Sequence, residues 1–300
     1  MKKLLITAVI AFAVLGSSAH ADGTLDKVKS SGSITQGVRE SSGLAYTLGN
    51  GIYTGYHYDV CQNIIADIKK KLGLEKLEIR YQPVTSQNRV PLVQNGTVDI
   101  ECGSTTNNTA RAKDVAFADT VYVEEVKIAV RADSPINKLE DLNGKTVATT
   151  TGTTSVQTLR KNKRAKDITF NEVYGKDHAD SFLLLQSGRA DAFVMDASIL
   201  AANIARAQDP KAFKILPEVL SVEPIAIMIR KDDPDFKKVV DDSIAEQIKN
   251  GTIAKLYEKW FMQPIPPNNV TLNMPASEAT KNAWANPNDK PAEDYKQPGQ

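Results

Sequence analysis

The sequence has few of the residues that carry metal, redox or nucleophilic chemistry. Only two of its 300 residues are cysteine and three are histidine, and their positions do not give the spacing of a metal site. It has no Gly-x-Ser-x-Gly turn, no phosphate-binding loop and no paired nucleotide-binding glycines. Basic and acidic residues nearly balance, 37 against 36, so the charge does not favour nucleic acid or an anionic membrane surface as a partner. The sequence therefore predicts no metal and no cofactor, and it contains none of these enzyme motifs.

Long hydrophobic runs are also missing, except for one near the N-terminus. Two lysines precede an apolar stretch over residues 4–15, which is too short to span a bilayer. Residues 19–21 then form the small-x-small pattern typical of a secretory cleavage site. We predict a signal peptide over residues 1–21, whose removal changes the formal charge from +1 to −1. No cysteine stands at the cleavage point, so we expect an exported protein without a lipid anchor or membrane insertion.

The two cysteines, Cys61 and Cys102, lie far apart in the sequence. An oxidising compartment would allow them to form a disulfide. The alternative is two buried free thiols, which we slightly favour.

Strand and helix patterns alternate along the chain in two similar halves. Residues 92–100 and 184–192 both contain a helix end, a glycine stop and a short strand, and each follows a polar helix start. A repeat of this length is typical of two α/β lobes of like construction and not of a solenoid. A mature length of about 280 residues also favours two domains.

Two apolar segments without glycine, residues 121–130 and 223–229, separate the halves. We interpret them as strands that cross between the lobes. The predicted domains are lobe 1, which comprises residues 22–123 plus 226–300, and lobe 2, which comprises residues 124–225.

Several local signals predict where helices begin and end. Asp59 is expected to cap a helix that continues to Gly73. An amphipathic stretch over residues 236–248 predicts the helix that returns the chain to lobe 1. Beyond residue 264 the tail is rich in proline and asparagine, and we expect at most a short helix around residues 277–284, with the rest wrapping lobe 1 or fraying.

The most informative stretch runs from Glu101 to Arg111. An alternating run over residues 98–102 predicts a strand, and it leads into a glycine, three hydroxyl residues and two asparagines. A strand end followed by a small polar turn and a helix start is where an α/β sheet offers backbone N–H groups to an anion. Arg111, expected one to two turns into the following helix, can bind a carboxylate through two parallel hydrogen bonds. For this motif alone, a surface turn with a solvated arginine is the alternative.

Two more arginines occupy similar positions. Arg39 follows a strand over residues 34–38, and Arg89 lies in a hydroxyl-rich helix start after a strand over residues 77–81. A single arginine is usually a solvated surface residue. Three arginines at strand ends or helix starts of one lobe are better explained by convergence on anions.

Five motifs in one order, spanning nearly the whole mature chain, resemble those of the periplasmic glutamate/aspartate-binding proteins of bacterial ABC transporters. The motifs are Arg39-Glu40-Ser41-Ser42, Thr85-Ser86-Gln87-Asn88-Arg89, residues 101–108, residues 150–155 and Lys176-Asp177-His178-Ala179-Asp180-Ser181. The resemblance implies a two-lobe α/β venus-flytrap fold with type II strand order, which closes by hinge motion on its ligand. It also implies a monomer in the periplasm that delivers glutamate or aspartate to an inner-membrane permease.

The resemblance assigns one group of side chains to each charge of the ligand. The group for the α-carboxylate is Arg111, Thr106 and Thr153. The group for the α-ammonium is Ser104 and Asp196. The group for the side-chain carboxylate is Arg39, Ser86, Arg89 and His178, with Thr150 close by. An acidic amino acid carries two carboxylates and one ammonium, and the three arginines against Asp196 match that balance.

The sequence departs from the family pattern at one place. Where the family usually has a proline followed by an aromatic residue, this chain has Gly43-Leu44-Ala45-Tyr46. Either Tyr46 supplies the missing aromatic wall of the site, or the pocket is looser. The other histidine of the mature chain, His57, is expected to be structural.

Two alternatives to a transport protein remain open at this point. One is a dehydratase-like periplasmic enzyme that uses the same fold on a carboxylate substrate. It would need a general acid in the cleft, and the candidates are Asp196, His178 and Glu101. The other alternative is the soluble ligand-binding component of a sensor.

Overall fold

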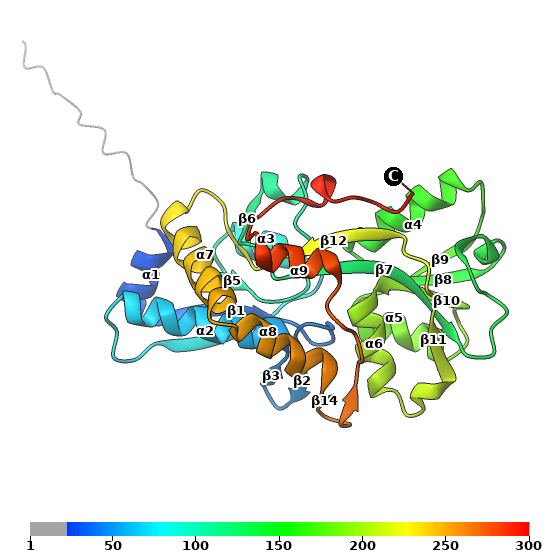
Figure 1. Cartoon of the computed structure of the whole chain (residues 1–300), viewed down its shortest axis with the longest axis horizontal. Helices are drawn as coiled ribbons and strands as arrows, with labels where there is room; N and C mark the ends of the chain where they lie inside the picture. The colour runs from blue at the N-terminus through cyan, green and yellow to red at the C-terminus, as the bar shows by residue number, and fades with distance from the viewer. Residues whose placement is uncertain (1–22, 300) are drawn as a thin grey trace, which may run out of the picture.

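The computed structural model describes residues 23–299 and places two α/β lobes side by side along the long axis of the molecule (Figure 1). The sheet of lobe 1 has five strands in the order β4-β1-β5-β13-β6. The sheet of lobe 2 has six, in the order β11-β7-β10-β8-β9, with β12 paired to β7. The prediction of two α/β lobes is therefore confirmed, and the order in lobe 1 is the predicted type II order. The predicted signal peptide lies outside the described residues.

The elements of lobe 1 come from both ends of the chain. Its strands are β1 (Ser33–Val38), β4 (Glu78–Pro83), β5 (Ile100–Glu101), β6 (Val115–Phe117) and β13 (Met228–Arg230). The helices packed on them are α1 (Thr24–Ser31), α2 (Tyr56–Lys71), α3 (Arg89–Gln94), α7 (Pro234–Lys249) and α8 (Thr252–Tyr257). A separate hairpin consists of β2 (Tyr46–Gly49) and β3 (Ile52–Thr54).

Lobe 2 is formed by the middle of the chain. Its strands are β7 (Tyr122–Arg131), β8 (Thr146–Thr150), β9 (Asn171–Gly175), β10 (Ala192–Asp196), β11 (Phe213–Ile215) and β12 (Ser221–Ile225). Its helices are α4 (Thr154–Ala165), α5 (His178–Gln186) and α6 (Ala197–Arg206). The strands β8 and β10 are buried almost throughout, because helices cover both faces of the sheet.

The internal repeat forms the same local structure in both lobes. In lobe 1 the Asp99 N–H donates to the Thr35 carbonyl at 2.9 Å, and the Asp99 carboxylate accepts from the Thr35 N–H at 2.8 Å. In lobe 2, Asp191 makes the same two bonds with Thr146, at 2.7 and 2.8 Å. Each aspartate therefore ties the strand that follows a glycine stop to another strand of the same sheet, β1 in lobe 1 and β8 in lobe 2.

The chain crosses between the lobes twice, along neighbouring paths. The first crossing leads into β7, which agrees with the strand predicted over residues 121–130. The prediction of one strand over residues 223–229 is wrong, because β12 and β13 are separate strands in different sheets. β12 pairs antiparallel with β7, from Ser221 opposite Val126 to Ile225 opposite Tyr122. The two crossing segments are therefore hydrogen-bonded to each other beside the cleft.

Cys61 of α2 and Cys102, which follows β5, form a disulfide, so the preference for free thiols is wrong. The two residues are 41 positions apart, and both are buried in the core of lobe 1. Only the packing of α2 across the sheet brings them together. The bond ties α2 to the start of the loop that contains Ser104 and Thr106.

Two local predictions about helix starts are also wrong. The helix α2 begins at Tyr56, so Asp59 lies in its first turn and is not its cap. The residue before the helix is Gly55, whose φ of 125° and close approach to the Leu44 carbonyl exclude a side chain there. Arg111 does not lie inside a helix, because it is the first residue of a short 3₁₀ segment, η1 (Arg111–Lys113).

The C-terminal tail is held along the crossing strands. A helix is confirmed near the predicted position, as α9 (Glu278–Ala285), and Trp284 donates from Nε1 to the Val121 carbonyl at 2.8 Å. The tail then follows the strands, where the Asn288 carbonyl accepts from the Thr120 N–H at 2.9 Å. Within residues 23–299, no helix is both long enough and apolar enough to cross a bilayer.

Candidate ligand-binding site

The ends of strands from both sheets meet between the lobes around a narrow cavity of about 10 Å³. Seven of the ten predicted site residues line it, namely Ser86, Arg89, Ser104, Thr106, Thr153, His178 and Asp196. The other lining residues are Thr154, Met195 and Ile199. A volume of this size holds about one water molecule. An amino acid would therefore enter the cavity only if the lobes moved apart.

The lobes are in contact around this cavity. The backbone of Gly152 in lobe 2 lies against Ser86 and Gln87 of lobe 1, and a Cβ on this glycine would lie 2.7 Å from the Gln87 Cα. Its φ of +80° is also in the region that favours glycine. The turn predicted over residues 150–155 thus reaches lobe 1 because it has no side chain at this point.

Arg39 does not line the cavity but lies directly behind two residues that do. Its side chain is fully buried, and its Nη2 is 3.0 Å from the Ser86 hydroxyl and 3.0 Å from the His178 Nε2. Asp177 is the nearest carboxylate, with its Oδ2 3.6 Å from the same nitrogen. Arg39 thus connects the α3 side of lobe 1 with the start of α5 in lobe 2.

Arg89 enters the cavity from the first position of α3. Its Nη1 donates to the Ser104 carbonyl at 3.0 Å, and only 2% of the residue is exposed. Burial lowers the pKa of its guanidinium well below the usual value, and the nearby charges of Arg111 and Arg39 lower it further. A negative charge beside these arginines would be strongly favoured.

Arg111 does not line the cavity but lies beside it, where it lines a neighbouring hollow. Its Nη1 donates to the Thr106 carbonyl at 2.9 Å, and its Nη2 reaches the Gly152 carbonyl of lobe 2 at 3.4 Å. The loop before it, from Gly103 to Thr106, is buried, so this guanidinium lies over a rigid turn. Arg111 is the predicted arginine that contacts backbone of both lobes.

His178 is held by a hydrogen-bonded chain of lobe 2 hydroxyl groups. Burial, with the charge of Arg39, lowers its pKa to about 3, so the ring is neutral at pH 7. Because Arg39 can only donate, the His178 Nε2 accepts, and Nδ1 carries the proton toward the Thr150 hydroxyl at 3.0 Å. Thr150 in turn lies 2.8 Å from the Ser181 hydroxyl. This chain fixes the ring so that it orients Arg39.

Asp196 faces the arginines from lobe 2. It is the last residue of β10 and precedes α6, but its side chain does not cap that helix. Burial raises its pKa well above the usual value, and the carboxylates of Glu124 and Glu223 raise it further. An ammonium group in the cavity would be the natural counter-ion for this carboxylate.

Several buried donors around the cavity have no hydrogen-bond partner among residues 23–299. They are Arg39 Nε and Nη1, Arg89 Nε and the Ser104 hydroxyl. Buried polar groups in proteins rarely lack a hydrogen-bond partner, so unpaired groups around a cavity indicate a ligand. Three of the four are guanidinium N–H groups, which are matched best by a carboxylate. The arrangement favours an anion close to Arg39 and Arg89.

Two carboxylates make contacts between the lobes that the sequence analysis did not predict. The carboxylate of Glu223 bonds the hydroxyls of Thr106 and Thr154, one from each lobe. Asp177 of lobe 2 bonds the Ser41 hydroxyl of lobe 1. One signal was available, because Glu223 is a charged residue at the start of a stretch otherwise predicted to be buried.

Tyr46 does not line the cavity. Its ring packs edge-on against Trp260 at 6.2 Å, and the guanidinium of Arg206 lies 4.8 Å from its centre. The apolar part of the cavity wall comes instead from Met195 and Ile199 of lobe 2. His57 is also away from the cavity lining, with its Nδ1 2.6 Å from the Gly103 carbonyl.

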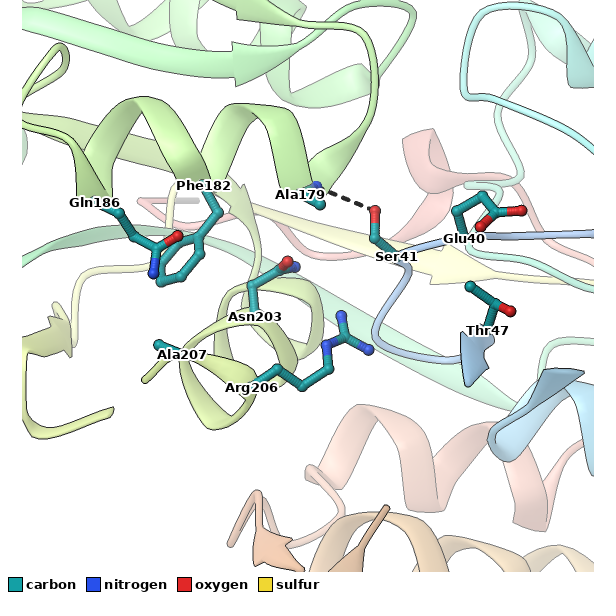
Figure 2. A pocket seen from close by; sticks show the side chains of 9 residues that line it. All are labelled: Glu40, Ser41, Thr47, Ala179, Phe182, Gln186, Asn203, Arg206 and Ala207. Atoms are coloured by element: carbon teal, nitrogen blue, oxygen red, sulfur yellow. Dashed lines mark hydrogen bonds between the residues drawn. The ribbon is translucent and has the colours of Figure 1, made fainter. Parts of the chain in front are cut away.

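A second hollow, of about 250 Å³, lies where Ser41 of lobe 1 meets the helices α5 and α6 (Figure 2). At its rim the Ala179 N–H donates to the Ser41 hydroxyl at 3.1 Å. None of the ten predicted site residues lines it. Its charged lining residues are Arg206 and Glu40, one of each sign, so it lacks the excess of cations expected around an acidic amino acid.

Within the described part of the chain, no group of three or more histidine, cysteine, aspartate or glutamate side chains is arranged to hold a metal ion. The groups that converge on the cavity are guanidinium, hydroxyl, imidazole and a single lining carboxylate. This set is suited to binding a small zwitterion with additional negative charge.

Comparisons with known proteins agree with this geometry. The chain is 44% identical over 295 residues to an L-glutamate/L-aspartate-binding protein of Pseudomonas aeruginosa, and the alignment covers 97% of each chain. It is 41% identical over 292 residues to the glutamate/aspartate import solute-binding protein of Escherichia coli, which covers 95% of this chain and 97% of that protein.

A solved structure gives a third comparison. It is an ancestral amino acid-binding protein described as a precursor of cyclohexadienyl dehydratase, with a TM-score of 0.68 and 30% identity over 79% of this chain and 99% of the other. The family model for bacterial extracellular solute-binding proteins, family 3, matches residues 34–263. The chain therefore belongs to the bacterial extracellular solute-binding proteins, family 3.

Proposed function

We propose that the protein captures L-glutamate or L-aspartate in the periplasm and delivers it, as a monomer, to an inner-membrane ABC permease. The observation that carries this proposal is the set of unpartnered guanidinium N–H groups of Arg89, which lines the cavity together with Asp196, and of Arg39 behind it. An acidic amino acid offers two carboxylates to the arginines and one ammonium to the aspartate. The names of the two relatives above support the same ligands.

The proposed roles of the side chains follow the charges of the ligand. Arg111 binds the α-carboxylate together with groups of Thr106 and Thr153. Asp196 and Ser104 receive the α-ammonium. The side-chain carboxylate lies near Arg89, Ser86, Arg39 and His178, and Thr150 acts through the His178 ring.

The proposed motion uses the two crossing segments as a hinge. Lobe 1, residues 22–123 plus 226–300, and lobe 2, residues 124–225, would each move as one body. The binding of ligand between them shifts the population toward the closed arrangement. The permease would then distinguish the closed protein from the open one.

Calorimetric titration of ligand-stripped protein against the twenty amino acids tests the ligand class. We expect tight binding of glutamate and aspartate, and much weaker binding of glutamine and asparagine. Equal affinity for the amides, or binding of a basic amino acid alone, would contradict the proposal.

An enzyme on the same fold is the second candidate function. Asp196, with its raised pKa, is the group best suited to act as a general acid, and the ancestral relative is described as the precursor of a dehydratase. We propose that the chain is not an enzyme. The titrated samples are to be analysed for converted ligand, and recovery of unchanged glutamate and aspartate is the expected result. Conversion that disappears in Asp196→Asn would favour the enzyme.

A further inference from the structure

Glu223 lies in β12, at the point where both lobes meet the crossing strands. Only 3% of the residue is exposed. Its Oε2 accepts from the Thr106 hydroxyl of lobe 1 at 2.6 Å and from the Thr154 hydroxyl of lobe 2 at 2.6 Å. Its Oε1 accepts from the Ser221 hydroxyl of its own strand at 2.9 Å. One carboxylate therefore joins the two lobes and the crossing strand.

The environment of Glu223 explains why these contacts matter for closure. The hydrogen bonds to its carboxylate come from three hydroxyl groups, and the charge of Arg111 interacts favourably with it. Burial of a charge is costly unless it is paired or well hydrogen-bonded. The hydroxyls of Thr106 and Thr154 are themselves only 3.3 Å apart, and they come from different lobes. Separation of the lobes would remove at least one of the two donors.

The same carboxylate also orders the predicted carboxylate-binding arginine. Because the Thr106 hydroxyl donates to Glu223, it has no proton left to donate to a ligand. The carbonyl of Thr106 accepts from Arg111 Nη1 at 2.9 Å, and the charge of Glu223 favours the charged form of Arg111. Thr106 therefore binds Arg111 through its backbone carbonyl, while its hydroxyl is bound to Glu223.

We propose that Glu223 is a positioning residue that bridges Thr106 and Thr154 when the lobes are closed and thereby slows the release of the ligand. We call these three residues the Glu223 bridge. The inference rests on the proposed function, because it concerns the rate at which a bound amino acid leaves. It predicts that the bridge affects dissociation far more than association, since the contacts form only after the lobes close.

The test compares Glu223→Gln, Thr154→Val and the double variant by stopped-flow measurement of glutamate association and dissociation. Each single variant is expected to release glutamate about tenfold faster, with an association rate within about twofold of the unaltered protein. The double variant should release it no faster than Glu223→Gln, because both substitutions break one bridge. Ser221→Ala is the matched control, since Ser221 bonds the same carboxylate from the same strand, and it should leave dissociation nearly unchanged.

Three results would overturn the proposal. They are unchanged dissociation in Thr154→Val, a double variant whose effect is the product of the single effects, and a Ser221→Ala effect as large as that of Thr154→Val. If the unaltered protein bound no amino acid, the proposed function would fail. The bridge would then be judged by small-angle scattering alone, where Glu223→Gln must give a larger radius of gyration than the unaltered protein, and equal radii would overturn it.

Discussion

The two lobes contribute different kinds of groups to the cavity. Lobe 1 supplies one arginine to the cavity lining, Arg89, and places Arg39 behind it and Arg111 beside it, each just beyond a strand or at the start of a helical segment. Lobe 2 supplies the N-terminal ends of α4, α5 and α6, together with one lining carboxylate, Asp196. We propose that the arginines of lobe 1 select the negative charges of a ligand, while Asp196 of lobe 2 pairs with its ammonium and lobe 2 covers it.

The pKa shifts point to the same division. Burial lowers the pKa of Arg89 in lobe 1 and raises the pKa of Asp196 in lobe 2, so each lobe presents a charge that the closed cavity does not compensate fully. A ligand that carries both signs would compensate both charges at once. A ligand that carries charge of only one sign would compensate the charge of only one lobe. The predictions that follow separate these contributions.

The largest effect is expected for Arg111→Ala, which should abolish detectable binding of every α-amino acid. Removal of one member of a desolvated charge pair typically costs ~2–5 kcal/mol. Calorimetric titration measures the loss. Arg80→Ala is a suitable control in the same lobe, because Arg80 is an exposed arginine paired with Glu78. Near-normal affinity in Arg111→Ala would remove this residue from the site.

Asp196→Ala tests the contribution of lobe 2. Glutamate and aspartate should be bound far more weakly, again by ~2–5 kcal/mol, because the ammonium loses its counter-ion. Simple dicarboxylates lack that ammonium and should be less affected. Competition titrations with glutarate and succinate measure the difference. An equal loss for the amino acids and the dicarboxylates would show that Asp196 does not recognise the ammonium.

Arg89→Gln should change selectivity more than it changes binding of amino acids in general. Glutamate should lose ~2–5 kcal/mol of binding free energy, which is ~30-fold to several-thousand-fold in the dissociation constant. Glutamine should lose much less, because a neutral amide needs no counter-charge. The ratio of the two dissociation constants should therefore narrow or reverse. An equal proportional loss of affinity for both ligands would show that Arg89 supports the shape of the site and does not bind the side-chain carboxylate.

The smallest effect concerns the two buried histidines, one in each lobe. Burial lowers the pKa of His57 to about 4, and burial with Arg39 lowers that of His178 to about 3. Below pH 6.5 the unfolded chain binds protons that the folded protein does not, so stability falls as the pH is lowered toward the folded values. Each histidine should lower the free energy of unfolding by about 2 kcal/mol between pH 7 and pH 5.

Urea unfolding of the unaltered protein, His178→Gln and His57→Gln at pH 7 and pH 5 measures this loss. Each variant should lose less stability between the two pH values than the unaltered protein. Glutamate affinity should change only in His178→Gln, because His57 bonds the Gly103 carbonyl and does not line the cavity. An unchanged pH dependence in both variants would contradict the assignment of neutral buried rings.

The predictable parts of the fold are those that depend on local backbone signals. The repeated glycine stops before Asp99 and Asp191 predicted the two lobes. Each stop is followed by an aspartate that forms hydrogen bonds within its own lobe. The polar turns at strand ends, together with the resemblance to the glutamate/aspartate-binding proteins, predicted most of the residues that line the cavity. Their assigned roles toward a ligand remain predictions.

The remaining features depend on packing between segments that are distant in sequence. The pairing of Cys61 with Cys102 requires α2 to lie across the sheet, which neither cysteine indicates. The position of Arg39 behind the cavity is set by Ser86 and His178, one from each lobe. The partners of Glu223 likewise come from two other segments, so its position in the sequence does not reveal them.

Small-angle scattering of the unaltered protein, with and without saturating glutamate, tests most directly the claim that lobe 2 closes over a ligand held by lobe 1. If the crossing strands act as a hinge, ligand should shift the population toward a more compact arrangement. We predict a smaller radius of gyration with glutamate than without it, and no change with lysine. Identical profiles at saturating glutamate would contradict closure and, with it, the division of work between the lobes.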